Sequence, residues 1–190
     1  MSEEGGHLTM SQDALVSAHG GESMAHVRYL IFAAEQAEKE GFKNVARLFR
    51  AIAYAEQVHA RNHYQRLSKF KDSFKVVAGA PFGPGDTRKN LELAIMGEQF
   101  EVEQMYPSYI ETAKLLNDKS AEISFRYALA AEKIHLELYR KALEYVAKGQ
   151  DMPLDGYVWI CPVCGHTYVG KEPPAKCPIC NALGKDFQRF

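Results

Sequence analysis

Long hydrophobic runs, a charge excess of one sign and any cysteine before position 161 are all missing from this sequence. No stretch approaches the ~20 apolar residues that a membrane-spanning helix needs, so we expect no membrane association. The formal net charge is −1, so no basic field favours nucleic acid as a partner. Residues 1–7 show no basic segment followed by an apolar run, so we expect no signal peptide and a cytoplasmic location.

All four cysteines lie between positions 161 and 180, in two Cys-x-x-Cys pairs: Cys161 with Cys164, and Cys177 with Cys180. In a reducing compartment, such pairs bind metal more often than they form disulfides. Two pairs can place four thiolates tetrahedrally around one iron or zinc ion. Zinc would make a structural ribbon and iron a one-electron carrier, and the spacing alone leaves both metals open.

The chain has 190 residues, which suits one medium domain followed by a small module. Apolar residues at helical spacing predict four helices, over about 9–39, 43–71, 86–116 and 118–148. The sequence therefore predicts a mostly α protein with a four-helix domain and a cysteine-rich module. The expected divisions are a flexible tail at 1–8, the helical domain at 9–149, a linker at 150–155 and the module at 156–190.

Several local signals qualify this helical pattern. Thr9 and Gln12 form a predicted capping box, whereas Gly20 and Gly21 interrupt the first helix at ~1 kcal/mol each. Pro107 lies inside the third helix, so we expect a kink or bulge near Tyr106.

Residues 72–86 contain Pro and Gly repeatedly and predict a long connection. This segment must return along the bundle if all four helices share one site. The second helix spans roughly 40 Å and the extended connection reaches ~50 Å, so the return is feasible. A helical hairpin exchanged between two subunits is the alternative.

Carboxylates and histidines occur in two copies of one pattern, shifted by 76 residues (22 to 98, 56 to 132, 59 to 135). The first copy is Glu22 with Glu56-x-x-His59, and the second is Glu98 with Glu132-x-x-His135. One Glu from each of two helices and Glu-x-x-His from each of two others form a dinuclear carboxylate site in a four-helix bundle. An oxygen-rich shell of this kind suits iron or manganese.

The alternative is that these are solvated helix residues. Apolar neighbours such as Ala55, Val58, Ala131 and Ile134 argue against it, because carboxylates buried together need cations. Glu101 breaks the repeat, since the corresponding position 25 is alanine, and it lies one turn beyond Glu98 as a candidate extra ligand.

Tyrosines and further histidines lie near these positions in the sequence. Tyr29 and Tyr106 are expected to orient ligand carboxylates through their hydroxyl groups. His26 and His63 have no repeat counterparts and are predicted to be surface or partly buried residues. His166 is predicted to be exposed, because four sulfurs already complete the cysteine site.

With these residues in view, the chain resembles rubrerythrin along nearly its whole length. The matching segments are Gly21 to Tyr29 (GESMAHVRY), Ala55 to His59 (AEQVH), Gly97 to Glu101 (GEQFE), Met105 to Pro107 (MYP), Ala131 to His135 (AEKIH) and the two cysteine pairs. The resemblance implies a ferritin-like four-helix bundle with two non-haem irons, followed by a rubredoxin-like module with one iron on four cysteines.

The resemblance also implies roles for these residues. Glu56 and Glu132 would bridge the irons, while Glu22, Glu98, Glu101 and His135 would be terminal ligands. One iron would exchange Glu101 for His59 on reduction. The family usually forms homodimers or higher homo-oligomers, with the rubredoxin-like module of one subunit near the di-iron site of another.

The implied activity is a peroxidase of oxidative-stress defence, which reduces hydrogen peroxide to water. The electrons would come from a rubredoxin or an NAD(P)H-dependent reductase through the module. Two alternatives compete with this interpretation. A ferritin-like ferroxidase that sequesters iron leaves the attached electron carrier unexplained. A zinc ribbon on a helical scaffold that contacts partners leaves the repeated carboxylates unexplained.

Overall fold

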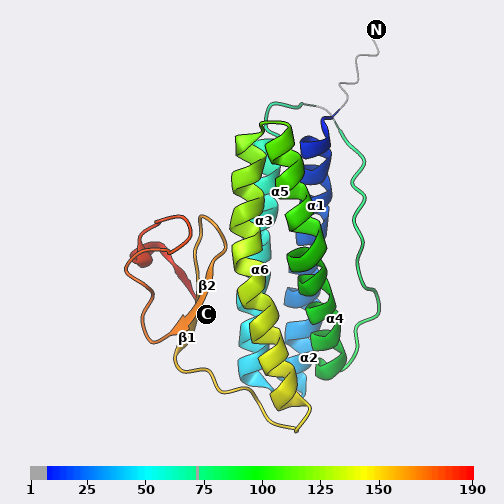
Figure 1. Cartoon of the computed structure of the whole chain (residues 1–190). Helices are drawn as coiled ribbons and strands as arrows, with labels where there is room; N and C mark the ends of the chain where they lie inside the picture. The colour runs from blue at the N-terminus through cyan, green and yellow to red at the C-terminus, as the bar shows by residue number, and fades with distance from the viewer. Residues whose placement is uncertain (1–7, 72) are drawn as a thin grey trace.

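Four parallel and antiparallel helical rods lie side by side, and a small β module packs against one side of them (Figure 1). The computed structural model describes residues 8–71 and 73–190, so nearly all of the predicted tail lies outside the described residues. This architecture confirms the predicted fold class, a mostly α four-helix bundle with a small C-terminal module.

The first rod joins three consecutive helical segments: α1 (Met10–Val27), η1 (Arg28–Ala33) and α2 (Ala34–Lys39). The predicted capping box is present, since the Thr9 hydroxyl accepts from the Gln12 N–H and the Gln12 side chain accepts from the Thr9 N–H. The second rod is α3 (Lys43–Arg66). The third joins α4 (Thr87–Phe100), η2 (Glu101–Met105) and α5 (Tyr106–Leu115), and the fourth is α6 (Lys119–Val146).

Two of these segments, η1 and η2, are π-helical. η2 ends immediately before Tyr106, so the predicted bulge near Pro107 is confirmed. Proline lacks an N–H and clashes with the carbonyl of the preceding turn, which a wider π turn relieves. η1 contains no proline, and its π register was not predicted.

The helix α3 ends at Arg66, five residues before the predicted end at 71. Beyond Arg66, Leu67 still packs against the bundle core, whereas Ser68, Lys69 and Lys71 are exposed. Helices in proteins derive most of their stability from packing of an apolar face, and little such surface remains here for a further turn to bury.

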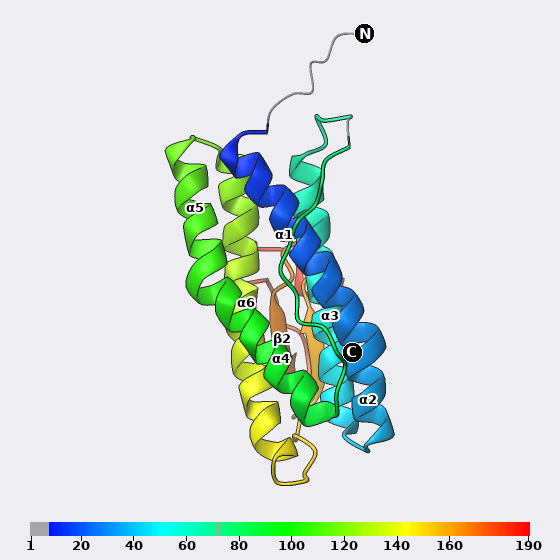
Figure 2. The ribbon, with the colours of Figure 1, turned by 90° about the vertical axis from the view of Figure 1, so that its right-hand side faces the viewer.

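The connection after α3 returns along the outside of α1 to the start of α4 (Figure 2). The Ser17 hydroxyl donates to the Val77 carbonyl at 3.2 Å, and Val76 packs directly on Gly20. A Cβ at position 20 would collide with Val76, so this glycine admits the connection. All four rods of the bundle come from one chain.

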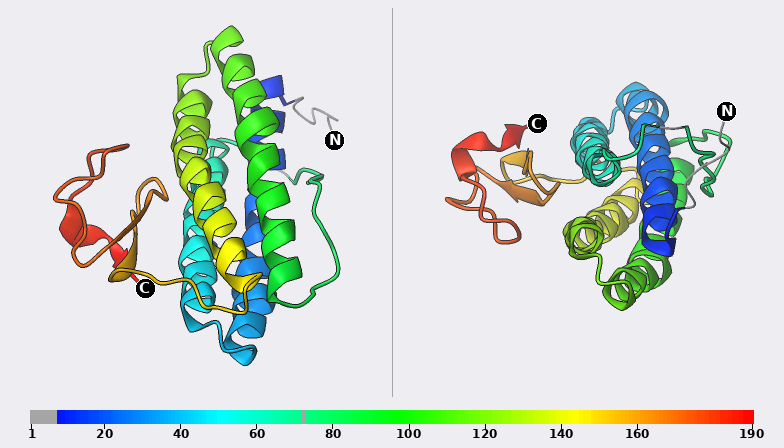
Figure 3. Two further views of the ribbon diagram at one scale, coloured as in Figure 1. Left: turned by 60° about the horizontal axis from the view of Figure 1, so that its bottom comes forward. Right: turned by 90° about the horizontal axis from the view of Figure 1, so that it is seen from above.

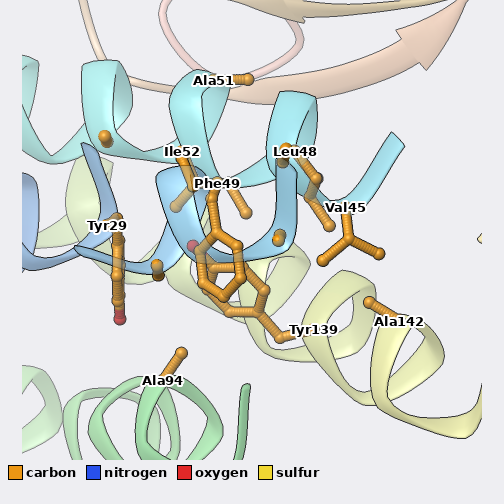
Figure 4. Close-up of a cluster of buried hydrophobic side chains, with 14 of the residues drawn as sticks. Tyr29, Val45, Leu48, Phe49, Ala51, Ile52, Ala94, Tyr139 and Ala142 are labelled. Atoms are coloured by element: carbon orange, nitrogen blue, oxygen red, sulfur yellow. The ribbon is translucent and has the colours of Figure 1, made fainter. Parts of the chain in front are cut away.

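A cluster of aromatic rings fills the bundle between η1, α3 and α6 (Figure 4). The ring of Phe49 lies 5.8 Å from that of Tyr29 and 5.0 Å from that of Tyr139, between centroids. All three side chains are buried. Burial of a side chain of this size stabilises the fold by about 1.5–3 kcal/mol, so the cluster holds the rods in register near the carboxylates.

The module contains a three-stranded antiparallel sheet in the order β2-β1-β3. Its elements are β1 (Tyr157–Ile160), β2 (Thr167–Gly170), η3 (Gly184–Asp186) and β3 (Gln188–Arg189). Figure 3 shows the module lying beside α3 and α6. No helix among the described residues is long and apolar enough to cross a bilayer.

The segment between bundle and module is tied to the start of α3. The Asp151 carboxylate accepts from the N–H groups of Asn44 and Val45 at 2.8 and 3.2 Å. These N–H groups have no partner within the helix, and the helix dipole favours a negative charge there. Met152 is fully buried beside this contact. The chain is thereby directed back along its own bundle.

Candidate metal centres

The six repeated residues converge at the middle of the bundle, from four different rods. Their polar atoms form two overlapping groups in which all ligand atoms lie within 4.8 Å of one another. Glu56 and Glu132 belong to both groups, Glu22 and His59 to one, and Glu98 and His135 to the other. All six side chains are buried. The arrangement is the one expected for two cations that share two carboxylates and have separate outer ligands.

Each imidazole turns its Nδ1 atom toward the shared carboxylates. His59 Nδ1 lies 2.7 Å from Glu132 Oε1 and 3.0 Å from Glu56 Oε2. His135 Nδ1 lies 2.6 Å from Glu132 Oε2 and 3.3 Å from Glu56 Oε1. The outer carboxylates are farther away, with Glu22 3.8 Å from His59 and Glu98 3.7 Å from His135.

Glu101 lies beside this centre but outside both groups. It is the first residue of η2, directly after α4. Burial raises the pKa of its carboxyl well above the usual value, and the negative charge of Glu22 raises it further. Glu101 is therefore close enough to sense the other carboxylates, while His59 occupies the position facing Glu22.

The concentration of carboxylates shifts the pKa values of the centre. Burial, then the charges of Glu56 and Glu132, raise the pKa of Glu98 to about 8. Burial also raises the pKa of Glu22. Burial opposes protonation of His59, but the charge of Glu132 prevails and raises its pKa to about 10. Without cations, the buried carboxylates are tolerated only because protons bound by the centre neutralise part of their negative charge.

The outward oxygens Glu22 Oε2 and Glu98 Oε2 are buried and have no hydrogen-bond partner within the described residues, and the shared carboxylates of Glu56 and Glu132 have only the two imidazoles as close partners. Buried polar atoms without partners are costly, and these all belong to groups that ligate metals. Two cations would satisfy them and balance the carboxylate charge, so the residues fit a dinuclear metal centre.

Two tyrosines donate hydrogen bonds to the outer carboxylates, one on each side. The Tyr29 hydroxyl donates to Glu98 at 2.9 Å, and the Tyr106 hydroxyl donates to Glu22 in a short contact. Both tyrosines are buried, one in η1 and one at the start of α5. The π segments thus place the two tyrosines at the two outer ligands.

Two histidine predictions were wrong. His63 is fully buried rather than superficial, because α3 turns it inward against the rings of Tyr106 and Phe125. His166 is buried rather than exposed, because it lies where the module meets the bundle. No repeat signal marks either residue, so only the tertiary packing reveals them. His26 is partly buried as predicted, with Nδ1 2.6 Å from the Ala53 carbonyl.

The four cysteines converge at the second centre. Their Sγ atoms lie within 4.8 Å of one another, with 3.5 Å between Cys161 and Cys180 and between Cys164 and Cys177. A tetrahedron with metal–sulfur bonds of about 2.3 Å has edges of roughly 3.8 Å, so the spacing fits one tetrathiolate metal. Hydrogen bonding from Cys164 lowers the pKa of Cys161 to about 5, which favours the thiolate that a metal requires.

The sequence predicts that the rings of Tyr157, Trp159, Tyr168 and Phe187 pack a small core around this centre, and two of the four do so. Phe187 is buried and Trp159 packs against the cysteines. Tyr157 and Tyr168 are exposed, although they were predicted to join this core. Tyr157, Trp159 and Tyr168 share one face of the sheet, because Trp159 lies two residues after Tyr157 and pairs with Tyr168. Val158 and Ile160 point to the opposite, buried face.

The two centres meet where the first cysteine hairpin touches the bundle. His135 Nε2 lies 2.8 Å from the Thr167 hydroxyl oxygen, and Gly165 packs against the ring of His59. The Asn62 amide donates to the Val163 carbonyl at 2.9 Å. Both imidazoles of the dinuclear centre therefore contact the cysteine module of the same chain. The resemblance had implied a neighbouring subunit for this position. Thr167 carried no motif and was not singled out from the sequence.

Family models match both parts of the chain. The model described as rubrerythrin matches residues 13–143, and the model described as rubrerythrin, rubredoxin-like domain, matches residues 159–188. The first covers more than half of the chain and includes all six repeated residues.

Curated relatives and solved structures agree with these matches. Rubrerythrin-2 of Clostridium acetobutylicum is 48% identical over 181 residues, which cover 95% of this chain and 97% of the relative. Nigerythrin of Nitratidesulfovibrio vulgaris is 33% identical over 166 residues, 87% of this chain and 79% of the relative. A solved structure of nigerythrin in its fully reduced, all-ferrous state covers 100% of this chain and 91% of its own, with 29% identity and a TM-score of 0.83.

Proposed function

Because this chain belongs to the rubrerythrin family, we propose that it is a di-iron peroxidase that reduces hydrogen peroxide to water. The chain has the two centres of this family, a di-iron carboxylate–histidine site in the bundle and a four-cysteine, rubredoxin-like site in the module. The observation that carries the proposal is the contact of the module with both imidazoles of the bundle centre, His135 to Thr167 and His59 to Gly165.

Each ligand has a role in this proposal. Glu56 and Glu132 would bridge the irons, because each faces both imidazoles, and Glu22 and Glu98 would be outer ligands beside His59 and His135 respectively. Glu101 would replace His59 as a ligand when the centre is oxidised. His59 lies inside the ligand groups and Glu101 just outside them, beside the same carboxylates.

When bound, the two ferrous ions supply the two electrons that cleave one peroxide O–O bond. The carboxylates of the centre are placed to accept and release the protons that the departing oxygens need. Tyr29 and Tyr106 hold the outer carboxylates in place through their hydroxyl groups. Burial of the site excludes bulk water from the reacting atoms.

The four cysteines would hold an iron ion that supplies electrons one at a time. The path leads from Cys164 through the adjacent Gly165 to the His59 ring, and through Thr167 to His135. An iron-storage protein has no need of this attached module, so the contact favours peroxide reduction over ferroxidase activity. The electrons come from a rubredoxin or an NAD(P)H-dependent reductase, which docks on the exposed side of the module.

The proposal extends to the assembly and its setting. We expect a homodimer or higher homo-oligomer in the cytoplasm, where the four free thiols stay reduced and available for iron. The proposed division of the chain is a helical domain at 9–149, a linker at 150–155 and the module at 156–190, after a tail at 1–8.

The test is anaerobic stopped-flow absorbance of the iron-loaded, fully reduced protein mixed with hydrogen peroxide. The ferric-thiolate bands of the module should appear rapidly, with stoichiometric loss of peroxide. The double variant Glu56→Ala/Glu132→Ala should lose this response. Glu103→Ala is the matched control, since Glu103 is an exposed carboxylate of η2 that pairs with Gln99. Equal rates in wild type and the double variant would refute the proposal.

A further inference from the structure

His63 is a buried polar residue next to the dinuclear centre but outside its ligand groups. It follows His59 by one helical turn of α3 and is fully enclosed, with its ring 5.5 Å from that of Phe125 and 5.9 Å from that of Tyr106. Its Nε2 atom is 4.0 Å from Glu22 Oε1, beyond hydrogen-bonding distance. A buried imidazole in an apolar setting needs partners for both ring nitrogens.

Both partners are present, and they form a chain that ends at Glu22. Ser124 Oγ of α6 lies 2.9 Å from His63 Nδ1, and His63 Nε2 lies 3.0 Å from the Tyr106 hydroxyl oxygen. The Tyr106 hydroxyl donates to Glu22 Oε1. Three hydrogen bonds thus connect α6, α3 and α5 to an outer carboxylate on α1.

Each link of this chain dictates the direction of the next. A carboxylate only accepts, so the Tyr106 hydroxyl gives its hydrogen to Glu22 and its oxygen is left to accept from His63 Nε2–H. Full burial between the rings of Tyr106 and Phe125 favours the neutral imidazole, which then carries its one hydrogen on Nε2. Nδ1 must then accept, and the Ser124 hydroxyl donates to it.

The other half of the repeat lacks this chain. There Tyr29 donates to Glu98, and the residue 76 positions after His63 is Tyr139. The Tyr139 ring lies 5.4 Å from that of Tyr29, but its hydroxyl has no hydrogen-bond partner in the described part of the chain. Tyr106, which donates to Glu22, is therefore hydrogen-bonded to a chain of two further residues. Tyr29, which donates to Glu98, has no such chain among the described residues.

We propose that His63 and Ser124 are positioning residues, which hold the Tyr106 hydroxyl hydrogen on Glu22 and so tune one side of the metal centre. Ser124 is itself buried, so the chain ends inside the protein and sets an orientation rather than conducting protons from solvent. The inference rests on the proposed role of Glu22 as a metal ligand.

The effect on the metal follows from polarisation along the chain. A hydroxyl that accepts a hydrogen bond becomes a stronger donor, so His63 makes Tyr106 withdraw more charge from Glu22. Without His63, Glu22 is more basic and favours the ferric state, which lowers the midpoint potential of the bundle centre. Glu22 also loses part of its fixed orientation, which weakens ferrous binding, and outer partners of this kind are worth about tenfold or more in metal affinity.

The experiment compares His63→Leu with His63→Gln in the full chain. Anaerobic titration measures ferrous binding to the bundle, and spectroelectrochemistry measures its midpoint potential, with the four-cysteine centre of the same molecule as the internal reference. The Leu variant should bind ferrous ion about tenfold more weakly and show a lower bundle potential, with the reference unchanged. Gln should restore both, because its amide can donate to Tyr106 and accept from Ser124. Tyr139→Phe, the matched control, should change neither.

A folded Leu variant with wild-type affinity and potential would overturn the inference. If the Leu variant does not fold, Ser124→Ala removes only the last link and should shift the potential in the same direction by less, with Ser124→Thr restoring it. An unchanged potential in Ser124→Ala would then count against the chain. Glu22→Gln distinguishes failure of the positioning role of His63 from failure of the ligand role of Glu22. Unaltered iron binding in that variant would refute the assignment of Glu22 as a ligand.

Discussion

His135 and Thr167 are joined by a contact of 2.8 Å between Nε2 and the hydroxyl oxygen, which links the dinuclear centre to the cysteine module. Thr167 begins β2, three residues after Cys164, and its hydroxyl also lies 3.4 Å from the Gly165 carbonyl. The hydroxyl therefore accepts from the imidazole and donates toward the cysteine hairpin. Thr167 therefore contacts both a ligand residue of the dinuclear centre and the hairpin that carries Cys161 and Cys164.

Replacement of Thr167 by valine should slow electron transfer between the centres. Valine keeps the shape of threonine but leaves the buried His135 Nε2 without a partner, which costs about 1–3 kcal/mol. We expect the rate of module oxidation after peroxide addition to fall by about tenfold. Stopped-flow absorbance of the ferric-thiolate bands measures it. Thr167→Ser, which retains the hydroxyl, is the control, and a serine variant as slow as the valine variant would exclude the hydroxyl as the cause.

A side chain at Gly165 should push the module away from the bundle. Gly165 has φ +80°, and a Cβ there would lie 2.6 Å from His59 Cδ2. Gly165→Ala should therefore slow electron transfer and expose the linker to proteolysis. Gly149→Ala is the matched control, because Gly149 also has positive φ (+68°) but a Cβ there would meet nothing within 4 Å among the described residues. Equal effects of the two substitutions would indicate backbone strain alone, which is about 1–2 kcal/mol at either site.

The stability of the metal-free protein should fall as pH rises. Glu98, with its pKa raised to about 8, and His59, with its pKa raised to about 10, each bind a proton in the folded state that the unfolded chain releases at lower pH. Folding therefore takes up protons between about pH 5 and 10, and stability is lost as pH rises through this window. The Tm of the chelator-treated protein should be lower at pH 9 than at pH 6. Iron-loaded protein should show a smaller decrease, and an equal decrease would place the titrating groups elsewhere.

The adjacent glycines of α1 should respond in opposite ways to alanine. Within the described structure, nothing lies within 4 Å of a Cβ at Gly21, so Gly21→Ala should raise the free energy of unfolding by about 0.8–1 kcal/mol through helix propensity. A Cβ at Gly20 would meet Val76 of the returning connection, so Gly20→Ala should give no gain or a loss. Urea denaturation of both variants measures the difference. A similar gain at both positions would show that the connection does not pack on α1.

Much of this protein was predictable from local and periodic features of the chain. The capping box at Thr9, the bulge before Pro107 and the overall bundle follow from short-range rules of helix formation. The convergence of the six repeated residues follows from spacing, because residues equidistant from a short turn lie level in a helical hairpin. The assignment of these residues and of Glu101 as iron ligands stays a prediction.

The sequence by itself determined the ligand types, their repeat and the two metal-binding modules, because spacing along helices and hairpins is a local property. Only the tertiary structure decided the burial of His63 and His166, the π register of η1 and the seat of the module on His59 and His135. These features depend on contacts between segments far apart in the chain. No periodicity records such contacts, because their free energy comes from the shape and polarity of whichever surfaces meet on folding.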